Sequence, residues 1–126
     1  MSASLLPGVD DLDFTARTTV DGPSVRVVMT GTADLNTQKQ LEAFLAGVHT
    51  CAIERLATTV VVDVRGLEFM NSSCLKRLVK WIFMAEAELA ERRYRIVFVA
   101  NPKAPWQRRS LHALSSMAPE LVTVQE

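Results

Sequence analysis

The sequence predicts a single α/β domain: a mixed central β-sheet with helices packed against it, in the order ββαβαβαβ. Three observations lead to this fold class. The 126 residues are 48% hydrophobic and 22% charged, which suits one domain with one core. Residues 59–64 and 94–100 are β-branched and almost continuously apolar, as buried strands are. Stretches with helical spacing alternate with these runs, which implies right-handed crossover connections.

The first part of the chain is predicted to form a leader and a hairpin. Residues 1–11 look like a flexible leader, so that the folded domain would span residues 12–126. Residues 14–20 and 25–29 have strand character, and the Asp-Gly-Pro sequence between them is a turn signal. We therefore expect these two strands to pair antiparallel.

A helix is expected after the hairpin. Residues 31–34, Gly-Thr-Ala-Asp, should end the second strand, and Asn36 or Thr37 can cap the helix that follows. The apolar residues of this helix recur at spacings of three and four and form one stripe for burial: Leu41, Phe44, Leu45 and Val48.

The second half adds the remaining strands and helices. Residues 59–64 should form a strand covered on both faces, and the longest helix should follow at residues 72–91. Residues 94–100 form the next buried strand, which the Asn-Pro pair after it ends. Residues 105–117 read as a final helix, with proline tolerated in the first turn, and residues 121–124 as a short last strand.

The longest helix also predicts a surface. At about 100° per residue, one face collects the apolar residues that should pack on the sheet: Leu75, Leu78, Val79, Ile82 and Leu89. Trp81 falls at the border of this face, beside Met84 and Lys80, and is expected to be partly exposed. Such a tryptophan indicates a binding surface. The alternative is that Trp81 folds onto a neighbouring loop.

Composition argues against several functions. The net charge is zero, with 14 basic and 14 acidic residues, so no global field attracts nucleic acid. Cys51 and Cys74 have no paired spacing, and the sequence gives no evidence for a disulfide framework, a metal or a cofactor. His49 and His112 are expected at the surface or its boundary. The sequence shows no signal peptide, and no apolar run approaches the roughly 20 residues that a membrane helix needs. We therefore expect a cytoplasmic protein.

The segment that joins the strand at residues 59–64 to the longest helix is the most informative one for function. It places Ser72 and Ser73 at a helix N-terminus, where backbone N–H groups point outward. Such a position suits an anion or a phosphorylated serine. The alternative is that a serine hydroxyl simply caps the helix.

Residues 63–73, Asp-Val-Arg-Gly-Leu-Glu-Phe-Met-Asn-Ser-Ser, resemble the signature of STAS domains of the anti-sigma factor antagonist type. The usual form of that signature is Phe-Met-Asp-Ser-Ser/Thr-Gly-Leu. Residues 31–34 resemble the Gly-Glu-Leu-Asp turn of the same family, and the likeness extends over about residues 14–124. The resemblance implies a STAS-like domain and a non-enzymatic regulator of bacterial transcription.

The resemblance also implies a partner and a switch. In this family the first serine of the pair, here Ser72, is phosphorylated by a partner kinase that is also the anti-sigma factor, and a phosphatase reverses the modification. The expected partner is therefore a protein, with no nucleic acid and no direct membrane insertion. A homodimer through Trp81 and Met84 is conceivable. The residues expected at the partner surface are Asp34, Asn71, Ser72, Ser73, Lys76 and Trp81.

Two departures from the signature keep other interpretations open. Asn71 replaces an aspartate and Cys74 replaces a glycine. The protein can therefore be a constitutive STAS subunit of a signalling or transporter complex without a phospho-switch. Cys74 is either a small filler or, at a helix N-terminus, a thiol with a lowered pKa. An enzyme with Ser72 or Cys74 as nucleophile lacks an identifiable base.

Overall fold

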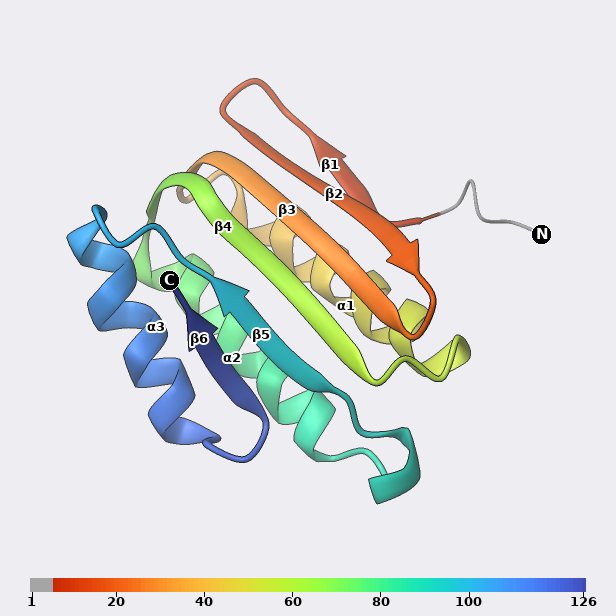
Figure 1. Cartoon of the computed structure of the whole chain (residues 1–126). Helices are drawn as coiled ribbons and strands as arrows, with labels where there is room; N and C mark the ends of the chain where they lie inside the picture. Colours follow the sequence, from red (N-terminus) through yellow and green to blue (C-terminus); the bar gives the residue numbers. More distant parts are fainter. Residues whose placement is uncertain (1–5) are drawn as a thin grey trace.

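One six-stranded sheet organises the chain, and its strands lie side by side in sequence order (Figure 1). The computed structural model describes residues 6–126. The first three strands pair antiparallel, and each later strand joins its neighbour in parallel. The strands are β1 (Gly8–Asp10), β2 (Phe14–Asp21), β3 (Ser24–Ala33), β4 (Thr59–Met70), β5 (Arg95–Val99) and β6 (Val122–Gln125).

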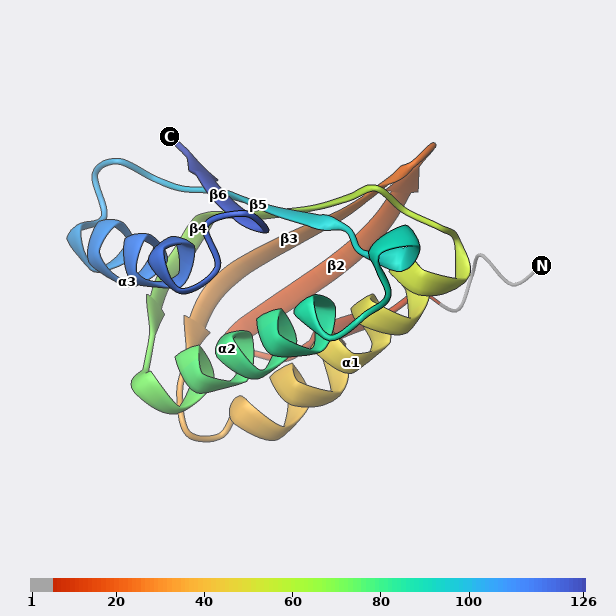
Figure 2. The ribbon, with the colours of Figure 1, turned by 90° about the horizontal axis from the view of Figure 1, so that it is seen from below.

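All α-helices of the described residues lie on one face of this sheet (Figure 2). They are α1 (Gln38–Glu54), α2 (Ser72–Glu86) and α3 (Pro105–Met117), and a short 3-10 helix, η2 (Ala90–Arg92), precedes β5. Leu41, Phe44, Leu45 and Val48 of α1 are buried as predicted. The predicted mixed α/β architecture is therefore confirmed, and α3 has the predicted bounds.

The opposite face of the sheet is uncovered. Alternate strand residues such as Val60, Val62 and Phe98 point to the helices and are fully buried. The residues between them, such as Val61 and Val97, point away and are only half-buried. The prediction that residues 59–64 are covered on both faces is therefore wrong, because no element of the described chain crosses over this side.

The sheet begins earlier than predicted. Residues 8–10, inside the predicted leader, form β1 and pair with β2, which adds one strand to the predicted order. Just before this strand, Pro7 packs against Gly47 of α1, where a Cβ atom would lie 3.0 Å from the proline ring. The leader prediction thus fails for residues 8–10, and residues 1–5 lie outside the described part of the chain.

Helix α2 ends at Glu86, five residues before its predicted end. Its buried residues are Cys74, Leu78, Trp81, Ile82 and Ala85. Leu89 was expected on the buried face, but it lies beyond the helix and is 62% exposed. The prediction therefore continued the helical spacing beyond Glu86, where the helix ends.

Strand β3 does not end at Gly31 as predicted but continues to Ala33. Gly31 adopts φ 95°, where a Cβ atom would lie 2.1 Å from the Asp13 carbonyl oxygen, so the close approach of β2 requires glycine. Beyond Asp63, β4 loses its pairing with β5. The buried Gln107 of α3 then donates its Nε2–H groups to the carbonyls of Val64 and Leu67, at 2.7 and 2.9 Å.

Candidate functional site

The N-terminus of α2 is built by Asn71 rather than by either serine. The Asn71 Oδ1 atom accepts a hydrogen bond from the Cys74 N–H at 2.9 Å, which is the geometry of an N-cap. Ser72 and Ser73 therefore occupy the first two positions of the helix. Ser72 is exposed, and its hydroxyl makes no hydrogen bond within residues 6–126. The cap leaves the Ser72 hydroxyl available to an incoming molecule.

Two loops are joined at this point. The Asn71 N–H donates to the Ala33 carbonyl at 2.9 Å, and the Cys74 thiol donates to the Asp34 carbonyl at 3.3 Å. These contacts hold the start of α2 against the loop between β3 and α1. Asp34, Asn71 and Ser72 are therefore brought together, as the sequence predicted, at the end of the sheet where β3 and β4 finish (Figure 1).

The Asp34 carboxylate already has a structural task. Its Oδ1 atom accepts from the Asn36 N–H at 3.0 Å and from the Thr37 hydroxyl at 3.3 Å. It therefore forms the turn that leads into α1, whose N-cap residue is Thr37. Asp34 is half-exposed, so the residue can both order its loop and contact a partner.

Sequence reasoning missed two apolar side chains near this site. Leu35 is 65% exposed and Phe69 is 48% exposed. Leu35 directly follows Asp34, and Phe69 pairs with Thr32 one residue before the end of β4. Lys76, exposed as predicted, lies one helical turn beyond Ser72. Large exposed apolar side chains beside polar ones are typical of protein-binding surfaces. A register shift at Glu68, which only the structure shows, turns Phe69 outward.

Trp81 does not belong to this surface. It is 1% exposed, and its Nε1–H donates to the Tyr94 hydroxyl at 2.9 Å. That hydroxyl lies 2.6 Å from His49 Nδ1, and His49 Nε2 lies 2.9 Å from a Glu88 oxygen. The prediction of a partly exposed Trp81 is thus wrong. His49, expected at the surface or its boundary, is 9% exposed and has a partner at each ring nitrogen. Met84 alone offers little basis for a homodimer.

Cys74 is a buried filler, not an activated nucleophile. Its side chain is fully buried. Burial, with a smaller effect from the negative charge of Asp34, raises the pKa of the Cys74 thiol. This direction is opposite to the lowered pKa expected from its position at a helix N-terminus.

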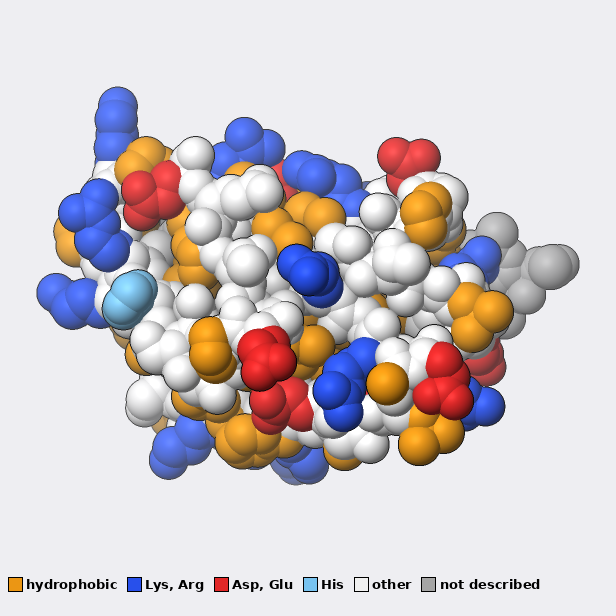
Figure 3. Space-filling view, turned by 60° about the horizontal axis from the view of Figure 1, so that its bottom comes forward, with side chains coloured by type: hydrophobic (Ala, Val, Ile, Leu, Met, Phe, Trp, Pro, Cys, Tyr) orange, Lys and Arg blue, Asp and Glu red, His pale blue; other side chains and the backbone are white. Residues whose placement is uncertain are grey.

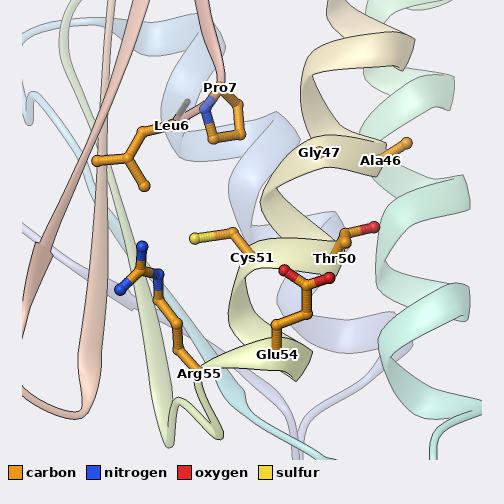
Figure 4. Close-up of a pocket in the computed structure, with 8 residues that line it drawn as sticks. All are labelled: Leu6, Pro7, Ala46, Gly47, Thr50, Cys51, Glu54 and Arg55. Carbon is orange, nitrogen blue, oxygen red and sulfur yellow. The ribbon is translucent and has the colours of Figure 1, made fainter. Parts of the chain in front are cut away.

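The described chain also has a groove away from the start of α2. A groove of about 470 Å³ lies between Pro7 and the second half of α1, with Cys51, Glu54 and Arg55 among the residues that line it (Figure 4). It is remote from Ser72 and holds no nucleophile paired with a base. Within residues 6–126 no cluster of His, Cys, Asp or Glu could hold a metal ion, and no helix is long and apolar enough to cross a membrane.

Comparison with solved structures identifies the fold. The chain is similar to an anti-sigma factor antagonist from Mycobacterium paratuberculosis, with a TM-score of 0.64 and 19% identity over 93% of this chain and 90% of that chain. It is similar to the Bacillus cell fate determinant SpoIIAA in its phosphorylated form, with a TM-score of 0.58 and 18% identity over 88% and 91% of the two chains. It is also similar to SpoIIAA in its unphosphorylated form, with a TM-score of 0.52 and 20% identity over 75% of this chain and 79% of that chain. No family model and no curated protein matches the sequence. The chain thus has the STAS fold of anti-sigma factor antagonists.

Proposed function

We propose that this chain, which has the fold of anti-sigma factor antagonists, is a non-enzymatic regulator that binds an anti-sigma factor or related serine kinase. The observation that carries the proposal is the exposed Ser72 hydroxyl at the start of α2, in a turn that the Asn71 N–H and the Cys74 thiol tie to the loop of Asp34. One of the solved relatives is named as a phosphorylated form. The proposed surface consists of Asp34, Leu35, Phe69, Asn71, Ser72, Ser73 and Lys76.

Phosphorylation of Ser72 would act locally. The phosphate adds a charge of about −1.5 to −2, which the N–H groups of the first helical turn favour. The same charge lies beside the exposed Leu35 and Phe69, and a partner that covers these side chains would have to desolvate it. Phosphorylation would therefore release the partner without refolding the domain, and a phosphatase would restore binding.

A kinase assay tests the phospho-switch. The protein is incubated with ATP and each serine kinase encoded near its gene, and phosphate is mapped by mass spectrometry. We expect modification at Ser72 and none in Ser72→Ala, while Ser73→Ala keeps it. Absence of phosphate at Ser72 with every such kinase would rule out the switch and leave the partner role to be tested separately.

A second candidate function is a constitutive STAS interaction subunit of a signalling or transporter complex. The observation that favours it is Asn71, whose neutral amide replaces the family's carboxylate and serves as the helix cap. Pull-down with Ser72→Asp separates the two functions, with Ser116→Asp, a charge placed on the exposed side of α3, as the matched control. Loss of the partner only in Ser72→Asp supports the switch, and equal recovery from both supports the constitutive subunit.

A further inference from the structure

The uncovered face of the sheet carries an apolar centre surrounded by arginines. Strand register places Arg26, Val61 and Val97 in one cross-strand row. The next row contains Arg17, Val28, Asp63 and Val99. Arg65 lies two residues after Asp63 on β4, and Arg95 lies two residues before Val97 on β5, so both side chains project from the same face. The valines are half-buried, so this is an apolar patch with water on one side.

The buried acid at the centre of this face, Asp63, does not neutralise all the arginines around it. Asp63 is 6% exposed, and both of its oxygens accept hydrogen bonds from Arg65, at 3.0 and 2.8 Å. Arg26 donates to the same carboxylate at 2.9 Å. One carboxylate thus holds two guanidinium groups in place, and Arg17 and Arg95 form no ion pair within the described residues. The open face therefore carries arginines near its apolar centre that are unpaired within residues 6–126, with Asp10 and Asp21 toward its edges, and Figure 3 shows both cationic and acidic side chains along its upper border.

The turn between β1 and β2 has the opposite character. Asp10, Asp11 and Asp13 are exposed, and Leu12 between them is 96% exposed, the highest value among the large apolar side chains of the described residues. The Asp13 carbonyl accepts the Thr32 N–H at 2.7 Å, so the turn is anchored on β3. It presents one leucine surrounded by three carboxylates on a fixed base.

We propose that a second copy of this chain docks its Asp10–Asp13 turn on the open face of the sheet. Leu12 would cover the patch formed by Val28, Val61, Val97 and Val99, and the aspartates would meet the arginines at its rim. Because the chain has a formal net charge of zero, two copies do not repel each other as wholes, and local complementarity decides their orientation.

The contact is small and would be weak. A single turn on a sheet face buries less than the roughly 1,200 Å² of a stable interface. We therefore expect dissociation constants between about 1 μM and 1 mM, with strong dependence on salt. Since donor turn and acceptor face are different surfaces, the association is head-to-tail and yields rings or short chains rather than one fixed dimer.

Sedimentation velocity over a concentration series tests this inference on the whole chain. The face variant is Arg17→Glu with Arg95→Glu, which leaves the Asp63 ion pairs intact. The turn variant is Asp11→Arg with Asp13→Arg. The control is Lys39→Glu with Arg109→Glu, which reverses two exposed cations on helices. Circular dichroism checks that each variant is folded.

We expect the wild type and the control to associate at low salt and to dissociate at about 0.5 M salt. Each of the other variants alone should stay monomeric. Mixing them should restore association, because the basic turn of one then meets the acidic face of the other. A monomeric wild type up to about 1 mM, equal loss in the control, or a mixture that stays monomeric would each overturn the inference. The outcome is independent of phosphorylation at Ser72.

Discussion

The two ends of α2 differ in what holds them. At its start, a single asparagine caps the helix, and the residue after it exposes a hydroxyl that has no hydrogen-bond partner among residues 6–126. At its end, Trp81 is buried and hydrogen-bonded to Tyr94, which in turn contacts His49. The first end is therefore arranged for an outside molecule, and the second for the stability of the domain. An aromatic residue on a helix surface pattern does not by itself mark a binding site.

Substitution of Trp81 is the most direct test of this difference between the two ends of α2. Trp81→Ala should lower the free energy of unfolding by about 3–5 kcal/mol, because it leaves a cavity and removes one of the two hydrogen bonds of the Tyr94 hydroxyl. Urea unfolding followed by circular dichroism measures the change. The matched control is Phe83→Ala on the same helix, where the ring is 55% exposed and the expected loss is below about 1 kcal/mol. Similar losses in both variants would contradict the division between the ends.

Tyr94→Phe tests the hydrogen bonds alone. It keeps the ring but leaves the Trp81 N–H and the His49 ring nitrogen unpaired, so we expect a loss of about 1–3 kcal/mol in the free energy of unfolding. In the same unfolding assay, a double-mutant cycle that combines Tyr94→Phe with Trp81→Phe should give a stabilising interaction energy between the two side chains. Additive effects would mean that the two side chains are energetically independent.

The same tyrosine predicts a dependence on alkaline pH. Burial raises the pKa of Tyr94 far above its usual value near 10, despite the opposing hydrogen bond from Trp81. A group whose pKa is raised on folding contributes stability that is present below the unfolded pKa and is lost as pH rises above it. Unfolding free energy should therefore fall above about pH 10. Tyr94→Phe should lose less over the same range.

At the start of the helix the expected effects are smaller. Asn71→Ala removes the cap and should cost about 1 kcal/mol in the unfolding assay. Asn71→Asp restores the family's carboxylate, keeps the cap and adds a charge that the helix N-terminus favours by about 0.3–1 kcal/mol. A destabilised Asn71→Asp would show that the amide has a further role at this position.

Ser72→Ala should change stability least, by less than about 0.5 kcal/mol, because the hydroxyl has no partner within the described chain. Thermal unfolding of Ser72→Ala beside wild type measures this. A loss near that of Asn71→Ala would mean that the serine contributes to the cap after all.

Local patterns predicted most of the fold and part of the site. β-branched runs and apolar spacing located the hairpin, α1 and α3, because those signals lie within a few residues. They could not show that Trp81 meets Tyr94, or that β4 continues past Val64 through the bonds of Gln107, since these contacts join residues far apart in the chain. Hydrophobic periodicity could not predict the Asn71 cap either. The cap depends on the backbone angles at the strand exit.

The strictly sequential order of the strands has a consequence for biogenesis. Each new strand pairs with the strand that left the ribosome just before it, and no early strand waits for a late one. Vectorial synthesis at about 5–20 residues per second can therefore build the sheet from one edge to the other. A nascent chain stalled after α1 would already hold β1, β2 and β3 paired, with the edge of β3 as the template for all further growth.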